Sequence, residues 1–156
     1  MNMNQFTQKS LAAIQGAQDI ALEYGNQQIE QPHLLLALVE DKEGFIPQLL
    51  TAMGMTVPSF EAAVKTEADK LPKVSGSGRE SGKVYVSQEV DRALQGAERE
   101  ARAMKDEYIS VEHILLGLLA HPSSALKELF RTYRLDKETV MQALAQVRGS
   151  QRVTSD

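Results

Sequence analysis

Two histidines stand in the same short context at positions 80 residues apart. His33 opens the run 33–39 and His113 opens the run 113–119, and in both runs the six residues after the histidine are apolar or Gly. Imidazole can bind a metal or act as a general base, but a metal site needs further His, Asp or Cys ligands at suitable spacing. Neither run has such ligands. Each histidine lies near the third position of an expected helix, where it can turn back to the helix N-terminus. We therefore predict two buried structural histidines rather than ligands or bases.

The segment from Gly76 to Lys83 contains the residue types of a phosphate-binding loop. A Walker A loop has four residues between its two glycines, followed by Lys and then Ser or Thr. Here five residues separate Gly76 from Gly82, and Val84 follows Lys83. Six of the eight residues 75–82 are Ser or Gly, which is typical of a flexible linker. We expect a linker here, no cofactor bound by this chain and, since no catalytic triad or acid pair is evident either, no enzyme activity.

Acidic residues gather just before and inside the expected helix that carries His113. Asp106 and Glu107 precede it, and Glu112 falls in its first turn. One interpretation is support for the helix dipole, because an acid in the first turn is mildly stabilising. The other is a polar rim that holds a peptide or a partner protein. The residues alone favour the first interpretation.

The composition argues against several classes of partner. The formal net charge of the 156 residues is −4, whereas nucleic-acid-binding proteins usually have a basic excess. Trp is absent, and there are only 4 Phe and 4 Tyr to stack on bases. No apolar run approaches ~20 residues, and no secretory signal is visible. Cys is absent too, so we expect a cytoplasmic protein without disulfides that binds neither nucleic acid nor membrane.

The offset of 80 residues extends over most of the chain, which identifies an internal repeat. Identical residues at this offset include those of the two leucine-rich runs and several pairs outside them. The pairs outside the runs include Gln15-Gly16-Ala17 with Gln95-Gly96-Ala97, Ile29 with Ile109, Leu49 with Leu129 and Ala63 with Ala143. Two copies of one unit predict a pseudo-symmetric domain rather than a long solenoid.

Each copy contains signals for four helices. A run that is apolar on all sides is typical of a helix buried on all sides, so we expect 33–39 and 113–119 to be the central helices. Apolar periodicity, caps and Gly or Pro boundaries place the others. The expected helices span about 7–24, 31–41, 46–53 and 56–71 in the first copy, and 87–105, 110–119, 125–133 and 136–149 in the second.

The predicted fold class is therefore all-α, with eight helices arranged as two pseudo-symmetric four-helix repeats. Residues 1–149 form the domain, with repeat one at about 6–71, the linker at about 72–84 and repeat two at about 86–149. Residues 1–5 are expected to fray. The only β-like run, 83–86, is expected to be too short to matter. A polar tail follows at 150–156.

Three stretches of this chain resemble one protein family. The first comprises Gln5-Phe6-Thr7, Ala17-Gln18, Ile20-Ala21-Leu22, Asn26-Gln27, Ile29-Glu30 and His33-Leu34. The other two are Leu71-Pro72-Lys73-Val74-Ser75-Gly76-Ser77-Gly78 and Asp106-Glu107-Tyr108-Ile109-Ser110-Val111-Glu112-His113. They resemble the Clp N-terminal domains of ClpB-type protein disaggregases, which share the double-repeat format, and the resemblance covers about residues 5–149.

The resemblance implies a mobile domain, monomeric in isolation, that engages unfolded or aggregated polypeptide. Its parent would be a homo-hexameric ATPase whose ring threads that polypeptide, with ATP bound in modules beyond the tail. It also implies that Thr7, Asp106 and Glu112 take part in substrate handling, and that an apolar groove holds unfolded segments. The alternative is an adaptor-docking N-terminal domain of a ClpA- or ClpC-type protease ATPase, which has the same fold.

Overall fold

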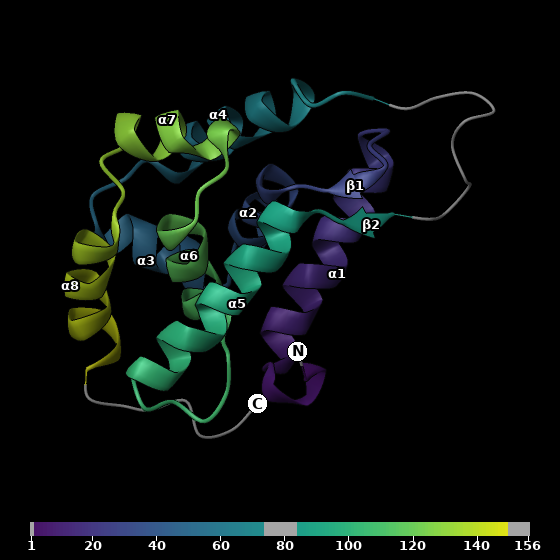
Figure 1. Ribbon diagram of the computed structural model, residues 1–156. Helices are drawn as coiled ribbons and strands as arrows, with labels where there is room; N and C mark the ends of the chain where they lie inside the picture. Colours follow the sequence, from purple (N-terminus) through teal and green to yellow (C-terminus); the bar gives the residue numbers. More distant parts are fainter. Residues whose placement is uncertain (1, 74–83, 150–156) are drawn as a thin grey trace.

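Eight α-helices account for most of the residues that this computed structural model describes, 2–73 and 84–149 (Figure 1). The expected Gly/Ser linker at 75–82 and the tail at 150–156 lie outside the described residues. The helices are α1 (Gln8–Glu23), α2 (Gln31–Glu40), α3 (Phe45–Ala52), α4 (Val57–Asp69), α5 (Gln88–Ala103), α6 (Val111–Ala120), α7 (Ser124–Thr132) and α8 (Lys137–Arg148). The minor elements are a 3-10 helix (Met3–Gln5) and the strands β1 (Gln28–Ile29) and β2 (Tyr85–Val86).

Local sequence signals set the helix boundaries, and the expected ends lie within two residues of the observed ones. Thr7 caps α1 by accepting a hydrogen bond from the Ser10 N–H (3.1 Å), and Ser87 caps α5 in the same way from the Val90 N–H (3.1 Å). Gly25 follows the C-terminus of α1 with φ of 74°, a left-handed conformation that glycine adopts without steric cost. The 3-10 helix at Met3–Gln5 shows that the expectation of a frayed N-terminal segment was wrong.

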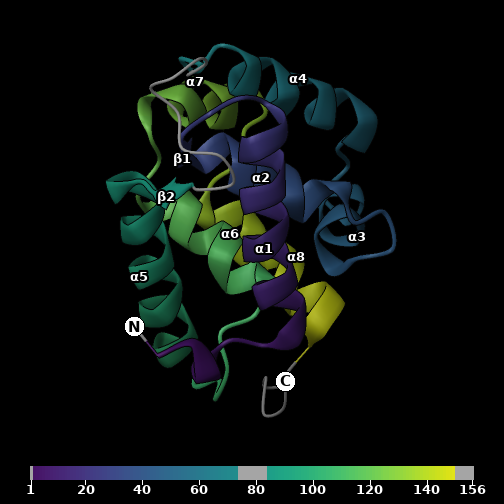
Figure 2. The ribbon, with the colours of Figure 1, turned by 90° about the vertical axis from the view of Figure 1, so that its right-hand side faces the viewer.

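The two leucine-rich helices lie at the centre of the molecule, as predicted (Figure 2). In α2 the side chains of Leu35 and Leu36 are fully buried, and so are Leu115 and Leu116 in α6. The other helices surround them: α1 and α4 pack on α2, whereas α5 and α8 pack on α6. The prediction of an all-α fold built on these two helices is confirmed.

Two parallel backbone contacts join the repeats and reveal their symmetry. In β1–β2, Ile29 pairs with Val86, and an isolated bridge pairs Phe6 with Ile109. At an offset of 80, Phe6 corresponds to Val86 and Ile29 corresponds to Ile109. The segment before the first helix of each repeat therefore pairs with the segment before the second helix of the other repeat. The expectation that the β-like run was too short to matter was wrong, because the partner segment supplies the missing hydrogen bonds.

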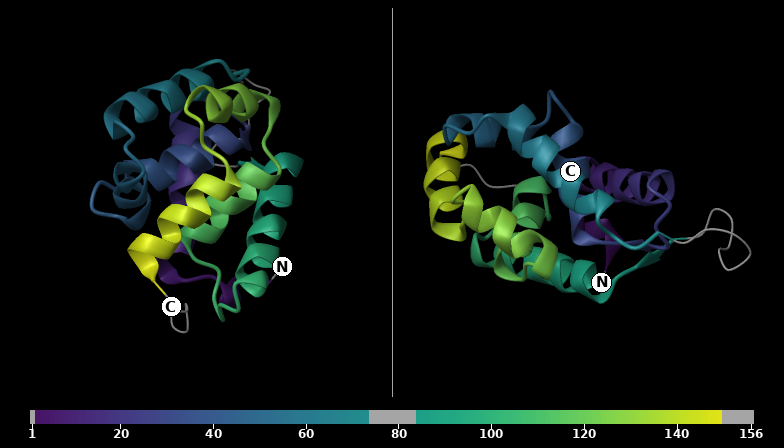
Figure 3. Two further views of the ribbon diagram at one scale, coloured as in Figure 1. Left: turned by 90° about the vertical axis from the view of Figure 1, so that its left-hand side faces the viewer. Right: turned by 90° about the horizontal axis from the view of Figure 1, so that it is seen from above.

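Side chains from both repeats also meet directly. Gln31, fully buried at the start of α2, donates from Nε2 to the carbonyl oxygens of Glu89 (2.9 Å) and His121 (2.8 Å). Its Oε1 accepts from the Ser123 N–H (2.8 Å), so one side chain ties α2 to three backbone positions of the second repeat. Beyond this tie, α4 lies beside α7 along one edge, and α8 crosses α6 and also contacts α3 (Figure 3).

Candidate functional site

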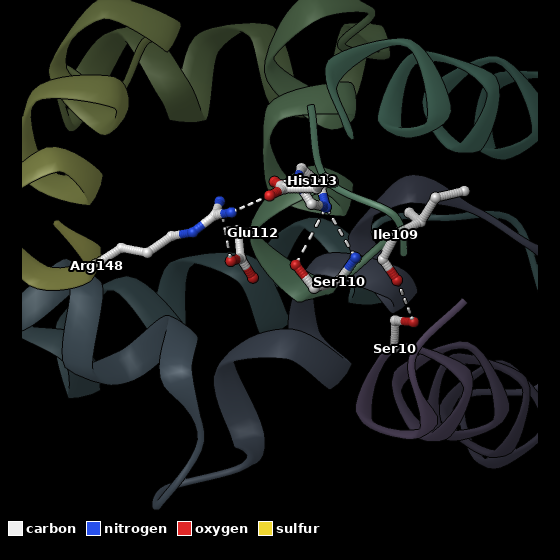
Figure 4. A network of polar contacts seen from close by, with 7 residues as sticks. Ser10, Ile109, Ser110, Glu112, His113 and Arg148 are labelled. Carbon is white, nitrogen blue, oxygen red and sulfur yellow. Dashed lines mark hydrogen bonds and ion pairs between the residues drawn. The ribbon is translucent and has the colours of Figure 1, made fainter. Parts of the chain in front are cut away.

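Six residues hold the loop between α5 and α6, residues 104–110, through two groups of polar contacts, and Figure 4 labels four of them, Ser10, Glu112, His113 and Arg148. Two come from α1 and its cap, one from the loop itself, two from α6 and one from the C-terminal end of α8. We call them the polar clamp: Thr7, Ser10, Asp106, Glu112, His113 and Arg148.

His113 links the clamp to the start of α6. Its Nδ1 accepts a hydrogen bond from the Ser110 N–H (2.8 Å), and therefore Nε2 carries the proton of the neutral ring and donates to Asp106 Oδ2 (2.7 Å). Burial lowers the pKa of His113, outweighing the nearby carboxylates of Glu112 and Asp106. The geometry agrees with this direction, because a proton on Nδ1 would break the bond from the Ser110 N–H.

Arg148 contributes the cation of the clamp from the last residue of α8. Its Nη2 donates to Asp106 Oδ1, and its Nη1 lies 3.6 Å from Glu112 Oε2. The Asp106 side chain has no exposed surface, and the side chains of Glu112 and Arg148 are 8% and 9% exposed. Two buried acids thus share one buried guanidinium, which holds the end of α8 against the α5–α6 loop and the first turn of α6.

The opposite side of the same loop is held by α1 and its cap. The Thr7 N–H donates to the carbonyl oxygen of Ile109 (2.9 Å), and the Ser10 hydroxyl donates to that same oxygen (2.9 Å). In return, the Ile109 N–H donates to the carbonyl oxygen of Gln5 (2.7 Å). The loop is therefore fixed between the first helix of repeat one and the last helix of repeat two.

The family model "Clp repeat (R) N-terminal domain" matches residues 5–133. The chain belongs to this family. Similar curated proteins include the chaperone protein ClpB of Nitratidesulfovibrio vulgaris, 42% identical over 99% of this chain, and that of Bacillus cereus, 37% identical over 99%. The chain spans 18% of the length of each of these relatives.

Solved structures show the same fold. The N-terminal domain of Hsp104 from Candida albicans superposes with a TM-score of 0.82 at 24% identity, covering 97% of this chain and 96% of that one. A complex of a ClpV N-domain with a VipB peptide superposes with a TM-score of 0.70 at 17% identity, covering 97% and 91%. The Clp N-terminal fold, with two repeats of four helices, is therefore common to this chain and both structures.

Within this Clp N-terminal domain, the three predicted site residues meet at one loop. Thr7 lies on one side of the α5–α6 loop, and Asp106 and Glu112 lie on the other. The alternative interpretation of the acids as a polar rim would need them at the surface, but the side chains of Asp106 and Glu112 are buried and bonded within the domain, and so is that of Thr7. Glu112 does lie in the first turn of α6, as expected of a residue that supports the helix dipole. Their part in substrate handling stays a prediction.

The sequence reasoning missed Arg148 as the partner of both acids. The repeat offers a signal that could have found it. Subtracting 80 from the charged positions 106, 112 and 148 gives three neutral residues, Asn26, Pro32 and Ala68. The three charged residues of the clamp therefore all occur in the second repeat and are all neutral in the first. This joint change is expected of charges that neutralise one another in a buried cluster.

The two histidines themselves behave alike, as predicted. Nδ1 of His33 accepts from the Glu30 N–H (2.9 Å), and Nε2 donates to Asn26 Oδ1 (2.8 Å). Both rings are fully buried, which confirms the prediction of structural histidines. Within residues 2–73 and 84–149, no group of three or more His, Cys, Asp or Glu side chains could hold a metal ion. No helix in this part of the chain is long and apolar enough to cross a membrane.

Proposed function

We propose that this domain engages unfolded or aggregated polypeptide on behalf of a ClpB-type ATPase. The observation that carries the proposal is the 42% identity to a ClpB chaperone over 99% of the chain. In this proposal the chain is one part of a longer cytoplasmic protein whose ATP-binding modules assemble as a homo-hexameric ring. The domain itself binds no cofactor, is monomeric in isolation, and delivers polypeptide that the ring threads.

We further propose that Thr7, Asp106 and Glu112 affect substrate binding as positioning residues. Their side chains are buried, so they would act through the exposed parts of the α5–α6 loop rather than by touching the substrate. Glu107 and Lys105 are the exposed side chains of that loop nearest to Asp106 in sequence. Loosening the clamp would shift these groups and weaken binding without unfolding the helices.

Fluorescence anisotropy with a labelled, permanently unfolded model protein tests both proposals. The wild-type domain should bind it weakly and reversibly. The variant Asp106→Asn/Glu112→Gln keeps the side-chain shapes but removes the negative charges that hold Arg148, and should bind several-fold more weakly. The matched control Asp91→Asn/Glu138→Gln removes two exposed acids from the first turns of α5 and α8 and should bind as wild type does.

Thermal unfolding of each variant separates a positioning role from loss of fold. Unchanged binding by a folded Asp106→Asn/Glu112→Gln domain would exclude a role for the two acids in substrate handling. No binding of the unfolded protein by the wild type would refute the proposed function itself.

Adaptor docking is the second candidate, since a related ClpV N-domain has been solved with a VipB peptide bound. Such docking would need one specific partner sequence, whereas substrate engagement would accept many unfolded chains. Competition separates the two, because one unfolded protein should displace another from a substrate site but should leave a bound adaptor in place.

A further inference from the structure

The turn between α5 and the α5–α6 loop contains a strained residue. Lys105 has φ of 61°, a left-handed conformation that residues other than glycine rarely adopt. At an offset of 80 it corresponds to Gly25, which has φ of 74° in the same turn of the first repeat. The second repeat therefore carries a backbone strain that glycine avoids in the first. Strain of this kind is often kept where a segment changes conformation.

The strained turn positions the central acid of the polar clamp. The Asp106 N–H donates to the carbonyl oxygen of Ala101 (2.9 Å), a bond that closes the C-terminus of α5 while Lys105 is left-handed. The carboxylate of Asp106 then accepts hydrogen bonds from His113 Nε2 (2.7 Å) and from Arg148. The left-handed turn and the buried ion pair are thus adjacent in the chain, and each helps to hold the other.

Both repeats bind the end of their fourth helix to this turn. In the first repeat, Asn26 Nδ2 donates to the carbonyl oxygen of Pro72, just beyond α4 (2.8 Å). In the second repeat, Asp106 corresponds to Asn26 and pairs with Arg148, the last residue of α8. The contact between the fourth helix and the turn is therefore a neutral hydrogen bond in one repeat and a buried ion pair in the other.

The ion pair couples the end of α8 to the loop. The guanidinium of Arg148 binds Asp106 and lies 3.6 Å from Glu112 Oε2, so it compensates two buried carboxylates. If the last turn of α8 moves away, these carboxylates lose their cation, and buried charge without a partner is strongly unfavourable. They reach water only if the loop moves as well, and that movement lets Lys105 leave its left-handed conformation. Partial displacement gains nothing, which favours two distinct arrangements.

We propose that the α5–α6 loop and the last turn of α8 form a two-state latch, with Arg148 and Lys105 as positioning residues for the binding of unfolded polypeptide. In the closed state Arg148 holds the loop, and in the open state the end of α8 is released and Lys105 is relaxed. This inference rests on the proposed function, in which binding depends on the held loop. Bound polypeptide therefore favours the closed state, and opening the latch lowers the affinity by the same coupling factor. Modules that follow α8 in the parent protein would release polypeptide by displacing this end.

Amide hydrogen exchange of residues 145–149 measures the opening of the latch. The Gly149 N–H donates to the carbonyl oxygen of Ala145 (3.1 Å) and exchanges when the end of α8 opens. A saturating amount of the unfolded model protein should slow exchange at these amides in the wild type. If the polypeptide binds and exchange at residues 145–149 is unchanged, the latch is refuted while the proposed function stands.

Two glycine substitutions test the strain without any polypeptide. Lys105→Gly relieves the strain of the closed state and should slow exchange at residues 145–149 roughly 3- to 10-fold. Arg134→Gly is the matched control, because Arg134 is also an exposed cation, has φ of 53° and corresponds to Gly54 in the first repeat. Its turn lies outside the clamp, so exchange at the end of α8 should stay as in the wild type. An equal effect of both substitutions would indicate general stabilisation and would refute the latch.

Removing the charges together separates a positioning role of Arg148 from loss of fold. Asp106→Asn/Glu112→Gln/Arg148→Met leaves no buried charge uncompensated and should remain folded in thermal unfolding. It should exchange faster at residues 145–149 and bind the unfolded protein several-fold more weakly, and bound polypeptide should no longer slow this exchange. A response equal to that of the wild type would mean that the polypeptide simply covers α8, which would refute the latch. If the wild type binds no unfolded protein, the proposed function fails, and the two glycine variants still decide whether the latch exists.

Discussion

Replacing Arg148 by Met should destabilise the domain far more than an ordinary change at a helix end. The guanidinium is the cation between the carboxylates of Asp106 and Glu112, and all three side chains are at least nine-tenths buried. Removing one partner of a buried ion pair leaves uncompensated charge and typically costs about 3–5 kcal/mol. Met keeps most of the aliphatic contact, so the loss would be electrostatic. For a domain of this size it corresponds to a drop of roughly 6–20 °C in the unfolding temperature.

A neutral version of the whole cluster provides the matched control. Asp106→Asn/Glu112→Gln/Arg148→Met removes the charges together, and replacing a complete buried cluster is often close to neutral. The first repeat supports this expectation. There, Asn26 takes the place of Asp106 and accepts the hydrogen bond of His33 Nε2 (2.8 Å). The positions that correspond to Glu112 and Arg148 hold the neutral residues Pro32 and Ala68. The triple variant should therefore be more stable than Arg148→Met alone, although it carries more substitutions.

Urea unfolding followed by circular dichroism measures both variants, with the free energy of unfolding taken from linear extrapolation. A loss below about 1 kcal/mol for Arg148→Met would mean that the charges are effectively solvated, contrary to their burial. A triple variant less stable than the single one would mean that the hydrogen-bond geometry, not the charge balance, holds the loop.

Three further predictions concern the helix starts and the interhelical contacts. Burial lowers the pKa of His33 to about 4, so the unfolded chain, with a histidine pKa of ~6.5, takes up a proton more readily than the folded domain. The contribution of His33 to the free energy of unfolding should thus be fully present above pH ~6.5, and it should fall by about 3 kcal/mol as the pH drops to ~4. Urea unfolding of His33→Gln at several pH values should show a smaller loss of stability over this range than the wild type. Thr7→Ala should cost about 1 kcal/mol of stability by removing the cap of α1, with Thr7→Ser close to wild type. Gly117→Ala should cost about 1–3 kcal/mol because its Cβ would meet the carbonyl oxygen of Ala93, whereas Gly16→Ala, which has space, should stabilise α1 by roughly 0.5–1 kcal/mol; thermal unfolding compares the two, and equal effects would contradict this difference in the space around the two glycines.

The helices could be predicted because their signals are local. Caps such as Thr7 and Ser87, and stop residues such as Gly25, act within one turn of the chain, and the apolar runs at 33–39 and 113–119 admit few alternatives to burial. The parallel pairing of β1 with β2 could not be read in the same way. Strands of two residues have no alternation, and their pairing depends on a fold that brings distant segments together.

The polar clamp illustrates the same limit at the site. The sequence led to Thr7, Asp106 and Glu112 through a resemblance, and an acid in a loop is exposed more often than not. Burial of the two acids depends on Arg148, which lies 42 residues beyond Asp106 and is carried to it by the packing of α8 on α6. Gln31 was missed for a similar reason, since its three partners belong to the other repeat.

Comparison of the two repeats separates the residues that the four-helix fold requires from those that it does not require. The helix caps, the buried histidines and the parallel contacts recur in both copies, so the scaffold depends on them. The charged triad of the clamp is confined to the second copy, and the acids at positions 19, 23, 40, 41 and 43 of the first copy have no acidic counterpart at an offset of 80. Since each copy folds without the other's feature, neither cluster is explained by the need to build a four-helix unit. Substitutions that remove all three charges of the clamp together should therefore change binding while they preserve the fold, whereas substitutions at the shared positions should destabilise the fold.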